Sequence, residues 1–421
     1  MSNHFKGWNA TIVGTCQICD VTSPVISDAL GLCPDCISRH PEQARKIALG
    51  VHTRSRKRWA LPGSPPRDPE GIVCNLCVNQ CRIPKGECGY CGLRHNTDGK
   101  MNGVSFERGN LSWYYDPLPT NCVGDWVCAG GTGCGFPQYA NCEGPEYGFD
   151  NLAVFCHACT FNCLYCQNWQ FRDQTHQSPV IKAEDLVNAL TTKTACICYF
   201  GGDPTPQLPF LLNASTSALI NQGDRILRIC WETNGSMSKH VLADLVDSAL
   251  HTGGCIKFDL KAWDETLHIA LTGVTNRQTL KNFTWIAGRI SERPMPPLLI
   301  ASTLMVPGYI GATEVGRIAA FIKRLDPNIP YSLLAFQPQH EMRDLAPSSP
   351  KQAENCINAA RKSGLKRKSS LKFFIKQWSS QAYHRFLTRM IFLPFDWLSQ
   401  ELSVRKQNSF HPTTNYLRMK G

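Results

Sequence analysis

Three cysteines in the middle of the chain have a spacing that suits a catalytic iron–sulfur centre. Cys159, Cys163 and Cys166 form a C-x3-C-x2-C pattern within one short segment. A [4Fe–4S] cluster normally takes four thiolates, one for each iron. Three ligands in one loop therefore leave one iron with an open coordination position, which distinguishes a catalytic metal centre from a structural one. The alternative is a zinc knuckle that borrows Cys156 or His157.

This cysteine pattern, with the aromatic Tyr165 directly before its last cysteine, resembles the radical SAM superfamily. The resemblance implies that the open iron binds the amino and carboxylate groups of S-adenosylmethionine (SAM). It also implies that an electron donor such as flavodoxin or ferredoxin drives cleavage of SAM to methionine and a 5′-deoxyadenosyl radical, which abstracts hydrogen from a substrate. Tyr165 would lie near the adenine.

Three further segments match this superfamily in order and spacing. Residues 201–204 (Gly-Gly-Asp-Pro) resemble its Gly-Gly-Glu-Pro element, in which the backbone and a carboxylate receive the SAM ammonium. Residues 232–235 (Glu-Thr-Asn-Gly) and 259–261 (Asp-Leu-Lys) resemble elements of the enzymes that activate glycyl-radical enzymes. The resemblance implies SAM contacts from Gly201, Gly202, Asp203, Pro204, Glu232, Asn234, Asp259 and Lys261.

Alternating short apolar runs and amphipathic segments from residue 151 onward predict βα units and a parallel sheet. The predicted strands are 151–155, 195–200, 227–231, 255–260, 297–305 and 331–336. The predicted helices are 183–191, 238–250, 276–290, 312–324 and 350–363. We expect an α/β fold: a partial (β/α)6 TIM-like barrel with N-terminal cysteine-rich metal-binding modules. In such a fold the loops at the strand C-termini carry the reactive residues.

Two upstream cysteine sets have the spacing of metal sites. The first consists of two Cys-x2-Cys pairs and suits tetrahedral zinc, with an iron–sulfur cluster as the alternative; its ligands would be Cys16, Cys19, Cys33 and Cys36. The second set suits zinc or an iron–sulfur cluster held by Cys74, Cys77, Cys88 and Cys91. Cys81 would be spare, unless the Cys77-x3-Cys81 pair joins an iron–sulfur site.

The remaining cysteines give weaker signals. The set in a Gly-rich run, whose wide spacing is weak support for a metal, is Cys122, Cys128, Cys134 and Cys142. The set in apolar strand-like runs, which we expect to be small core residues, is Cys196, Cys198, Cys230 and Cys255. The full count of 22 cysteines, in a large chain whose N-terminus lacks the order of a secretion signal, favours metal ligands over disulfides.

Composition and texture divide the chain into five parts. We expect a zinc-ribbon-like module at 1–50, a linker at 51–71, a cysteine-rich metal-binding region at 72–150, a radical SAM core at 151–364 and a basic C-terminal extension at 365–421. No stretch approaches the roughly 20 apolar residues that a membrane span requires. The expectation is a soluble, cytoplasmic protein.

The net charge of +11 lies in the tail. Residues 361–421 hold thirteen Lys and Arg against Asp396 and Glu401, whereas residues 1–360 are balanced. Such a tail could attract nucleic acid or an acidic partner, or it could be a solvated extension. The match to the superfamily ends near residue 366, so the tail is either a genuine extension or the product of a frameshift or misjudged gene boundary.

Two function classes follow from these patterns. The first is a radical SAM enzyme that acts on a protein or other large substrate, with activation of a glycyl-radical enzyme as one such activity. The second is a non-catalytic zinc protein that binds nucleic acid through its cysteine knuckles and basic tail. The second class explains the charge but does not explain the ordered segments at four strand ends.

Overall fold

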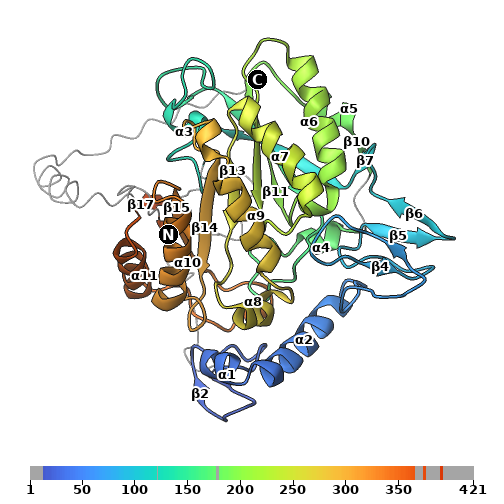
Figure 1. Ribbon diagram of the computed structural model, residues 1–421, viewed down its shortest axis with the longest axis vertical. Coiled ribbons are helices and arrows are strands. Elements are labelled where there is room, and N and C mark those ends of the chain that lie inside the picture. Colours follow the sequence, from blue (N-terminus) through green and yellow to red (C-terminus); the bar gives the residue numbers. More distant parts are fainter. Residues whose placement is uncertain (1–12, 121, 177–179, 366–372, 376–388, 392–421) are drawn as a thin grey trace, which may run out of the picture.

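The computed structural model describes residues 13–120, 122–176, 180–365, 373–375 and 389–391 (Figure 1). Its centre is a nine-stranded sheet with the order β17-β16-β15-β14-β13-β12-β11-β9-β8. Neighbouring strands run parallel, apart from β8 and β17 at the two edges, which pair antiparallel with β9 and β16. The strands are β8 (Leu111–Pro117), β9 (Asp150–Cys156), β11 (Thr194–Gly201), β12 (Arg228–Thr233), β13 (Ile256–Asp259), β14 (Leu299–Met305), β15 (Tyr331–Ala335), β16 (Phe373–Ile375) and β17 (Arg389–Ile391).

Helices connect the parallel strands and cover the sheet (Figure 1). They are α4 (Phe171–Gln174), α5 (Ala183–Asn188), α6 (Leu208–Gln222), α7 (Lys239–Thr252), α8 (Glu265–Thr272), α9 (Arg277–Ala287), α10 (Ala312–Leu325) and α11 (Pro350–Lys362). Because helices cover one face and the cavity and its loops the other, the strands are apolar along most of their length; β14 is buried at every residue. The predicted α/β fold with a parallel sheet is therefore confirmed, and all six predicted strands are present.

Three helices of this array, α4, α6 and α8, were not indicated by the sequence pattern, and α4 has only four residues. Helix α6 begins among prolines, with Pro206 in η1 (Thr205–Gln207) and Pro209 in its own first turn. Proline marks turns, but it also fits the first positions of a helix, where its missing N–H has no intrahelical partner. Helix α8 is short and almost wholly buried, so it shows little amphipathic contrast. Two further 3-10 helices are η2 (Ile290–Glu292) and η3 (His340–Met342).

The N-terminal module does not end at residue 50, because its second helix runs from Pro41 to Lys57. It consists of β1 (Gly14–Thr15), β2 (Thr22–Ser23), α1 (Pro34–Arg39) and α2 (Pro41–Lys57). The predicted boundary between module and linker falls inside α2, which lies along α8 at the lower edge of Figure 1. The basic residues assigned to the linker form the last turns of this helix, where cations complement the helix dipole.

The cysteine-rich region also does not end where predicted, because its strand β8 pairs with β9 along seven residues and forms one edge of the main sheet. The rest of the region is built from short ribbons. These elements are β3 (Ile72–Val73), β4 (Arg82–Ile83), β5 (Arg94–Thr97), β6 (Lys100–Gly103), β7 (Arg108–Gly109), α3 (Ala129–Thr132) and, paired with β7 from the core, β10 (Ile181–Lys182).

Most of the predicted C-terminal extension lies outside the described residues. Within it, β16 adds a parallel strand beside β15, and β17 pairs antiparallel with β16. Among the described residues, no helix has the length and apolar character needed to cross a membrane.

Candidate active site

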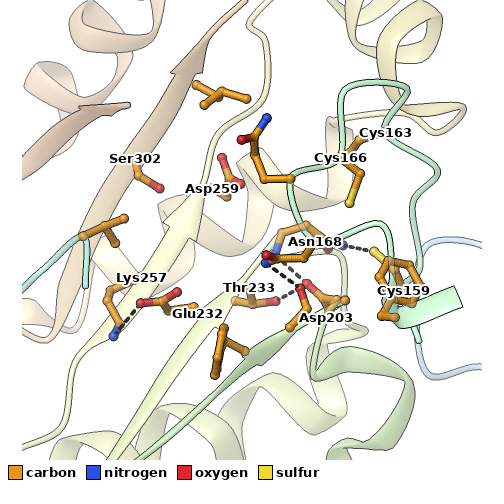
Figure 2. A pocket seen from close by; sticks show the side chains of 18 of the residues that line it. Cys159, Cys163, Cys166, Asn168, Asp203, Glu232, Thr233, Lys257, Asp259 and Ser302 are labelled. Atoms are coloured by element: carbon orange, nitrogen blue, oxygen red, sulfur yellow. Dashed lines mark hydrogen bonds and ion pairs between the residues drawn. The ribbon is translucent and has the colours of Figure 1, made fainter. Parts of the chain in front are cut away.

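The carboxyl ends of the parallel strands surround one cavity of about 310 Å³. The loop after β9 carries the three predicted cluster cysteines, and the ends of β11, β12 and β13 carry the other predicted segments (Figure 2). The predicted site residues that line it are Cys159, Cys163, Tyr165, Cys166, Gly201, Gly202, Asp203, Glu232, Asn234, Asp259 and Lys261. Pro204 does not line the cavity, because it is buried directly before η1.

The cysteine loop is tightly held. The Cys159 sulfur accepts hydrogen bonds from the backbone N–H of Phe161 at 3.3 Å and from Asn234 Nδ2 at 3.8 Å. Burial raises the pKa of the Cys163 thiol to about 12, although the nearby Lys261 ammonium opposes this rise. Thiols must lose their protons when they bind metal, so metal loading of this loop releases protons.

The geometry gives no support to a zinc knuckle that borrows neighbouring ligands. Cys156 is fully buried at the end of β9 and does not line the cavity. The His157 ring nitrogens lie 3.0 Å from Ser112 Oγ and 3.1 Å from Asn110 Oδ1. Both candidate ligands are therefore directed away from the cavity that the three cysteines share.

Asp203 fastens the loops around the cavity together. Its carboxylate accepts hydrogen bonds from the backbone N–H of Thr205 at 2.8 Å, from Thr233 Oγ1 at 3.0 Å and from the backbone N–H of Asn234 at 2.7 Å. Burial raises the pKa of this carboxyl group, and these donors oppose the rise. The carboxylate expected to receive the SAM ammonium thus already accepts three hydrogen bonds from the protein.

The Gly-Gly pair lets this loop lie directly on the cysteine loop. The backbone N–H of Gly202 donates to Cys156 O at 2.9 Å, and that of Asp203 donates to Ala158 O at 2.7 Å. A Cβ at Gly202 would lie 2.1 Å from Ala158 O, so a larger residue does not fit there. The loops after β9 and β11 therefore form one hydrogen-bonded unit.

Charged side chains on β12 and β13 form a row along the cavity wall, as the alternation along β13 predicts. Lys257 Nζ lies 3.0 Å from Glu232 Oε1 (Figure 2). Lys261, two residues beyond the end of β13, pairs with Asp259. Burial by itself would lower the pKa of Lys261, but the Asp259 carboxylate outweighs it and keeps the ammonium charged. The wall thus presents two ion pairs to whatever fills the cavity.

Three buried polar atoms of the cavity-lining residues have no hydrogen-bond partner among the described residues: Arg172 Nε, Tyr165 Oη and Asp259 Oδ1. An unpaired buried polar atom costs about 1–3 kcal/mol. A polar ligand in the cavity could form hydrogen bonds with Tyr165 Oη and Asp259 Oδ1. These two atoms fit a cofactor that carries hydroxyl and ammonium groups beside a thiolate-bound cluster.

Sequence reasoning missed part of the lining. Cys198, expected in the core, is buried but faces the cavity, where Lys257 Nζ lies 3.2 Å from its sulfur and 3.3 Å from that of Cys122. The period-2 alternation along β11 could have placed Cys198 on the inner face. No local signal marks the other lining residues from distant segments, such as Tyr114, Asp116, Arg172 and Ser302.

The N-terminal cysteine set converges as predicted. The thiols of Cys16, Cys19, Cys33 and Cys36 all lie within 4.8 Å of one another, which is the spacing of a site for a single ion. The Cys33 sulfur caps α1 by accepting from the backbone N–H of Cys36 at 3.4 Å.

The second cysteine set differs from the predicted one by one member. A small cavity beside the cysteine loop is lined by Cys74, Cys77, Cys81 and Cys91, whereas Cys88 is absent from the lining. Burial raises the pKa of the Cys91 thiol to about 11, and the nearby Cys74 and Cys81 add to the rise. Cys88 instead forms a β-bridge with His95. The spacing along the chain had left open whether Cys81 belongs to this site, and the structure brings Cys81 to the cavity.

Comparisons with known proteins identify a matching family model and several similar proteins. Residues 153–321 match the model of the Radical SAM superfamily. A protein of Methanocaldococcus jannaschii without an assigned function is 25% identical over 307 residues, which cover 71% of this chain and 80% of the relative. A candidate glycyl-radical enzyme activating enzyme of the same organism is 26% identical over 187 residues, covering 44% and 68%.

The pyruvate formate-lyase 1-activating enzyme of Escherichia coli is 26% identical over 165 residues, covering 37% of this chain and 61% of that enzyme. Among solved structures, SuiB of Streptococcus suis bound to S-adenosylmethionine aligns with a TM-score of 0.38 at 13% identity, covering 51% of this chain and 47% of SuiB. A domain of the pyruvate-formate lyase-activating enzyme from Bacteroides vulgatus aligns with a TM-score of 0.33 at 20% identity, covering 42% and 96%.

Proposed function

Because residues 153–321 form a radical SAM domain, we propose that this chain cleaves S-adenosylmethionine reductively to start hydrogen abstraction from a protein or other large substrate. The observation that carries the proposal is the convergence of three loop thiols with the ends of β11, β12 and β13 on one cavity. When bound there, a [4Fe–4S] cluster supplies the electron that generates a 5′-deoxyadenosyl radical from SAM. Cys159, Cys163 and Cys166 would hold the cluster.

The other residues of the cavity bind and orient. Asn234 donates to Cys159 and to Thr160 Oγ1, so it keeps the first ligand in place. Asp203 holds the β11 and β12 loops at a fixed separation. The free Tyr165 Oη and Asp259 Oδ1 are the atoms we assign to SAM, through its adenosine and its ammonium group. Burial of these groups excludes water from a reactive radical.

Activation of a glycyl-radical enzyme is the specific activity we propose within this class. Its support is the Glu-Thr-Asn-Gly segment at the end of β12, one relative named as a glycyl-radical enzyme activating enzyme and another named as a pyruvate formate-lyase activating enzyme. In this reaction the adenosyl radical would take one hydrogen atom from a glycine Cα, leaving 5′-deoxyadenosine and a protein radical. The electron would come from a donor such as flavodoxin or ferredoxin, in the cytoplasm.

SAM cleavage is tested by anaerobic reconstitution with iron, sulfide, SAM and dithionite, followed by chromatography of 5′-deoxyadenosine. We expect the wild-type chain to form 5′-deoxyadenosine and Cys163→Ala to form none. Cys156→Ala is the matched control, because Cys156 is an equally buried thiol three residues from the pattern that does not line the cavity. Equal product from Cys163→Ala and the wild type would overturn the assignment.

Glycyl-radical activation needs a separate test. A candidate partner enzyme, incubated with this chain, SAM and reductant, should acquire the EPR signal of a glycyl radical, and a partner with its glycine replaced by alanine should not. If 5′-deoxyadenosine forms while no partner gains the signal, the chain is a radical SAM enzyme with a different substrate. No observation on the described residues favours the nucleic-acid-binding alternative, whose basic tail lies largely beyond them.

A further inference from the structure

Four cysteines line a small cavity next to the loop that carries Cys159. Their sequence positions are spread over 18 residues, and the rest of the lining includes Asn79, Arg94 and, from the cysteine loop, Thr160. They are Cys74, Cys77, Cys81 and Cys91. Four convergent thiols at one cavity form the ligand set that zinc or an iron–sulfur cluster uses.

The local backbone explains why these thiols meet. The chain reverses between Cys77 and Cys81, where the backbone N–H of Gln80 donates to Cys77 O at 3.0 Å and Gln80 adopts a positive φ of 41°. The backbone N–H of Cys74 then donates to Cys81 O at 2.8 Å, and that of Tyr90 donates to the Cys81 sulfur at 3.4 Å. These bonds bring three cysteines of one ribbon next to the turn that carries Cys91.

The looser grouping of these thiols separates this site from the N-terminal one. Cys19 and Cys33 have their sulfurs 3.8 Å apart, inside the tight group that suits a single ion. Among the described residues, the thiols around the second cavity are not drawn together in that way, and neither are those of the C-x3-C-x2-C loop. Ligands of a four-iron cluster must stand farther apart than ligands of one ion, because each binds a different iron.

Direct hydrogen bonds join this cysteine ribbon to the first site. Asn79 Nδ2, in the turn between Cys77 and Cys81, donates to the backbone oxygen of Thr160 at 2.8 Å. The Thr160 hydroxyl lies 2.8 Å from Asn234 Nδ2 and from Ser236 Oγ. Thr160 directly follows Cys159, so the turn that holds the second thiol set also fixes the first ligand of the catalytic loop.

We propose that Cys74, Cys77, Cys81 and Cys91 hold a second iron–sulfur cluster beside the SAM-binding one, and that Cys88 is not a ligand. All four positions of this cluster are occupied by protein thiolates, so it has no open iron for a substrate. Its place against Thr160 gives it a supporting role for the catalytic loop.

The test counts metal in the anaerobically purified and reconstituted full chain. We expect about eight iron atoms and eight sulfides per chain in the wild type, and about four of each in Cys81→Ala. Cys88→Ala, the matched control, should keep about eight. The triple variant Cys159→Ala/Cys163→Ala/Cys166→Ala should retain about four irons, with the Mössbauer spectrum of a fully thiolate-bound cluster.

Three results would overturn this inference: no iron left in the triple variant, iron lost from Cys88→Ala while Cys81→Ala keeps it, or zinc in place of iron at these cysteines. The triple variant keeps the inference testable even if Cys81→Ala does not fold. A wild-type chain with about four irons that still forms 5′-deoxyadenosine would refute the second cluster and leave the proposed function standing.

Discussion

At the scale of single residues, the main observed role of Asp203 is to hold the loops around the cavity together. It is 2% exposed and accepts three hydrogen bonds that join the loops after β11 and β12. Replacing it with Ala leaves buried N–H and O–H donors unpaired, at about 1–3 kcal/mol each before relaxation. Losing these hydrogen bonds would weaken both folding and SAM binding, because the two loops line the cavity.

We therefore predict that Asp203→Ala lowers the free energy of unfolding by about 3 kcal/mol and abolishes SAM binding. Urea unfolding and equilibrium dialysis with labelled SAM measure the two effects. Ser302→Ala is the comparison: Ser302 lines the cavity outside the Asp203 network, its Oγ lies 3.4 Å from Phe258 O, and its replacement should change the unfolding free energy by less than about 1 kcal/mol. An Asp203→Ala chain as stable as the wild type would contradict this role.

Tyr165 gives the opposite expectation, since its hydroxyl is buried without a partner in the described residues. Tyr165→Phe should leave the unfolding free energy unchanged or slightly higher, and should weaken SAM binding about 5-fold through one lost hydrogen bond. Tyr199→Phe is the matched control, because Tyr199 Oη lies 2.8 Å from Ser215 Oγ, away from the cavity. It should lower stability by about 1 kcal/mol and leave the dissociation constant for SAM unchanged.

At the scale of elements, the N-terminal module packs against the core of the chain through α2. The buried His52 of α2 accepts a hydrogen bond from Asn162 Nδ2 at 3.0 Å, and its Nε2 lies 3.2 Å from Ile269 O and 3.1 Å from Ala270 O of α8. Asn162 lies between two cluster ligands. His52 thus contacts both α8 and the cysteine loop, and it holds α2 against them.

The metal of this module should be separable from the iron sites. We predict one zinc per chain, held by the four thiols within 4.8 Å of one another. Cys36→Ser should lose this zinc and keep its iron when both metals are counted by plasma mass spectrometry. Cys356→Ser, at a buried thiol of α11 outside the described cysteine groups, should retain both. Iron in place of zinc at these thiols would disprove the assignment.

At the scale of the whole molecule, buried neutral histidines make stability depend on pH. Burial lowers the pKa of His52 and of His268 to about 4, from an ordinary value of 6.5. Below pH 6.5 the unfolded chain binds protons at both rings while the folded chain does not until about pH 4. Their contribution is therefore fully present above pH 6.5 and is lost as the pH falls toward 4.

We predict a loss of up to about 3 kcal/mol for each histidine between pH 6.5 and 4. Anaerobic urea unfolding at half-unit pH steps measures the slope. His52→Gln should flatten it, whereas replacing the exposed His240, which is on the surface of α7, should not. An unfolding free energy that is constant over this range would show that neither ring is buried in the neutral form.

The sequence by itself predicted which residues line the main site and the order of the core strands. The three-cysteine spacing lies within one loop, and the alternation of Lys257 and Asp259 lies within one strand, so the sequence alone shows both local patterns. The six parallel strands followed from the same kind of local signal. Because parallel strands expose their carboxyl ends on one side, the motifs at those ends had to meet.

Only the tertiary structure decided which distant groups meet. The presence of Cys81 rather than Cys88 at the second cavity depends on the reversal at Gln80 and on the hydrogen bonds that hold it, since spacing along a chain does not fix the direction of a side chain. The packing of α2 against α8 and the pairing of β8 with β9 both depend on contacts between elements far apart in the sequence. Such contacts are chosen by packing and hydrogen bonding between surfaces, and those surfaces exist only in the folded chain.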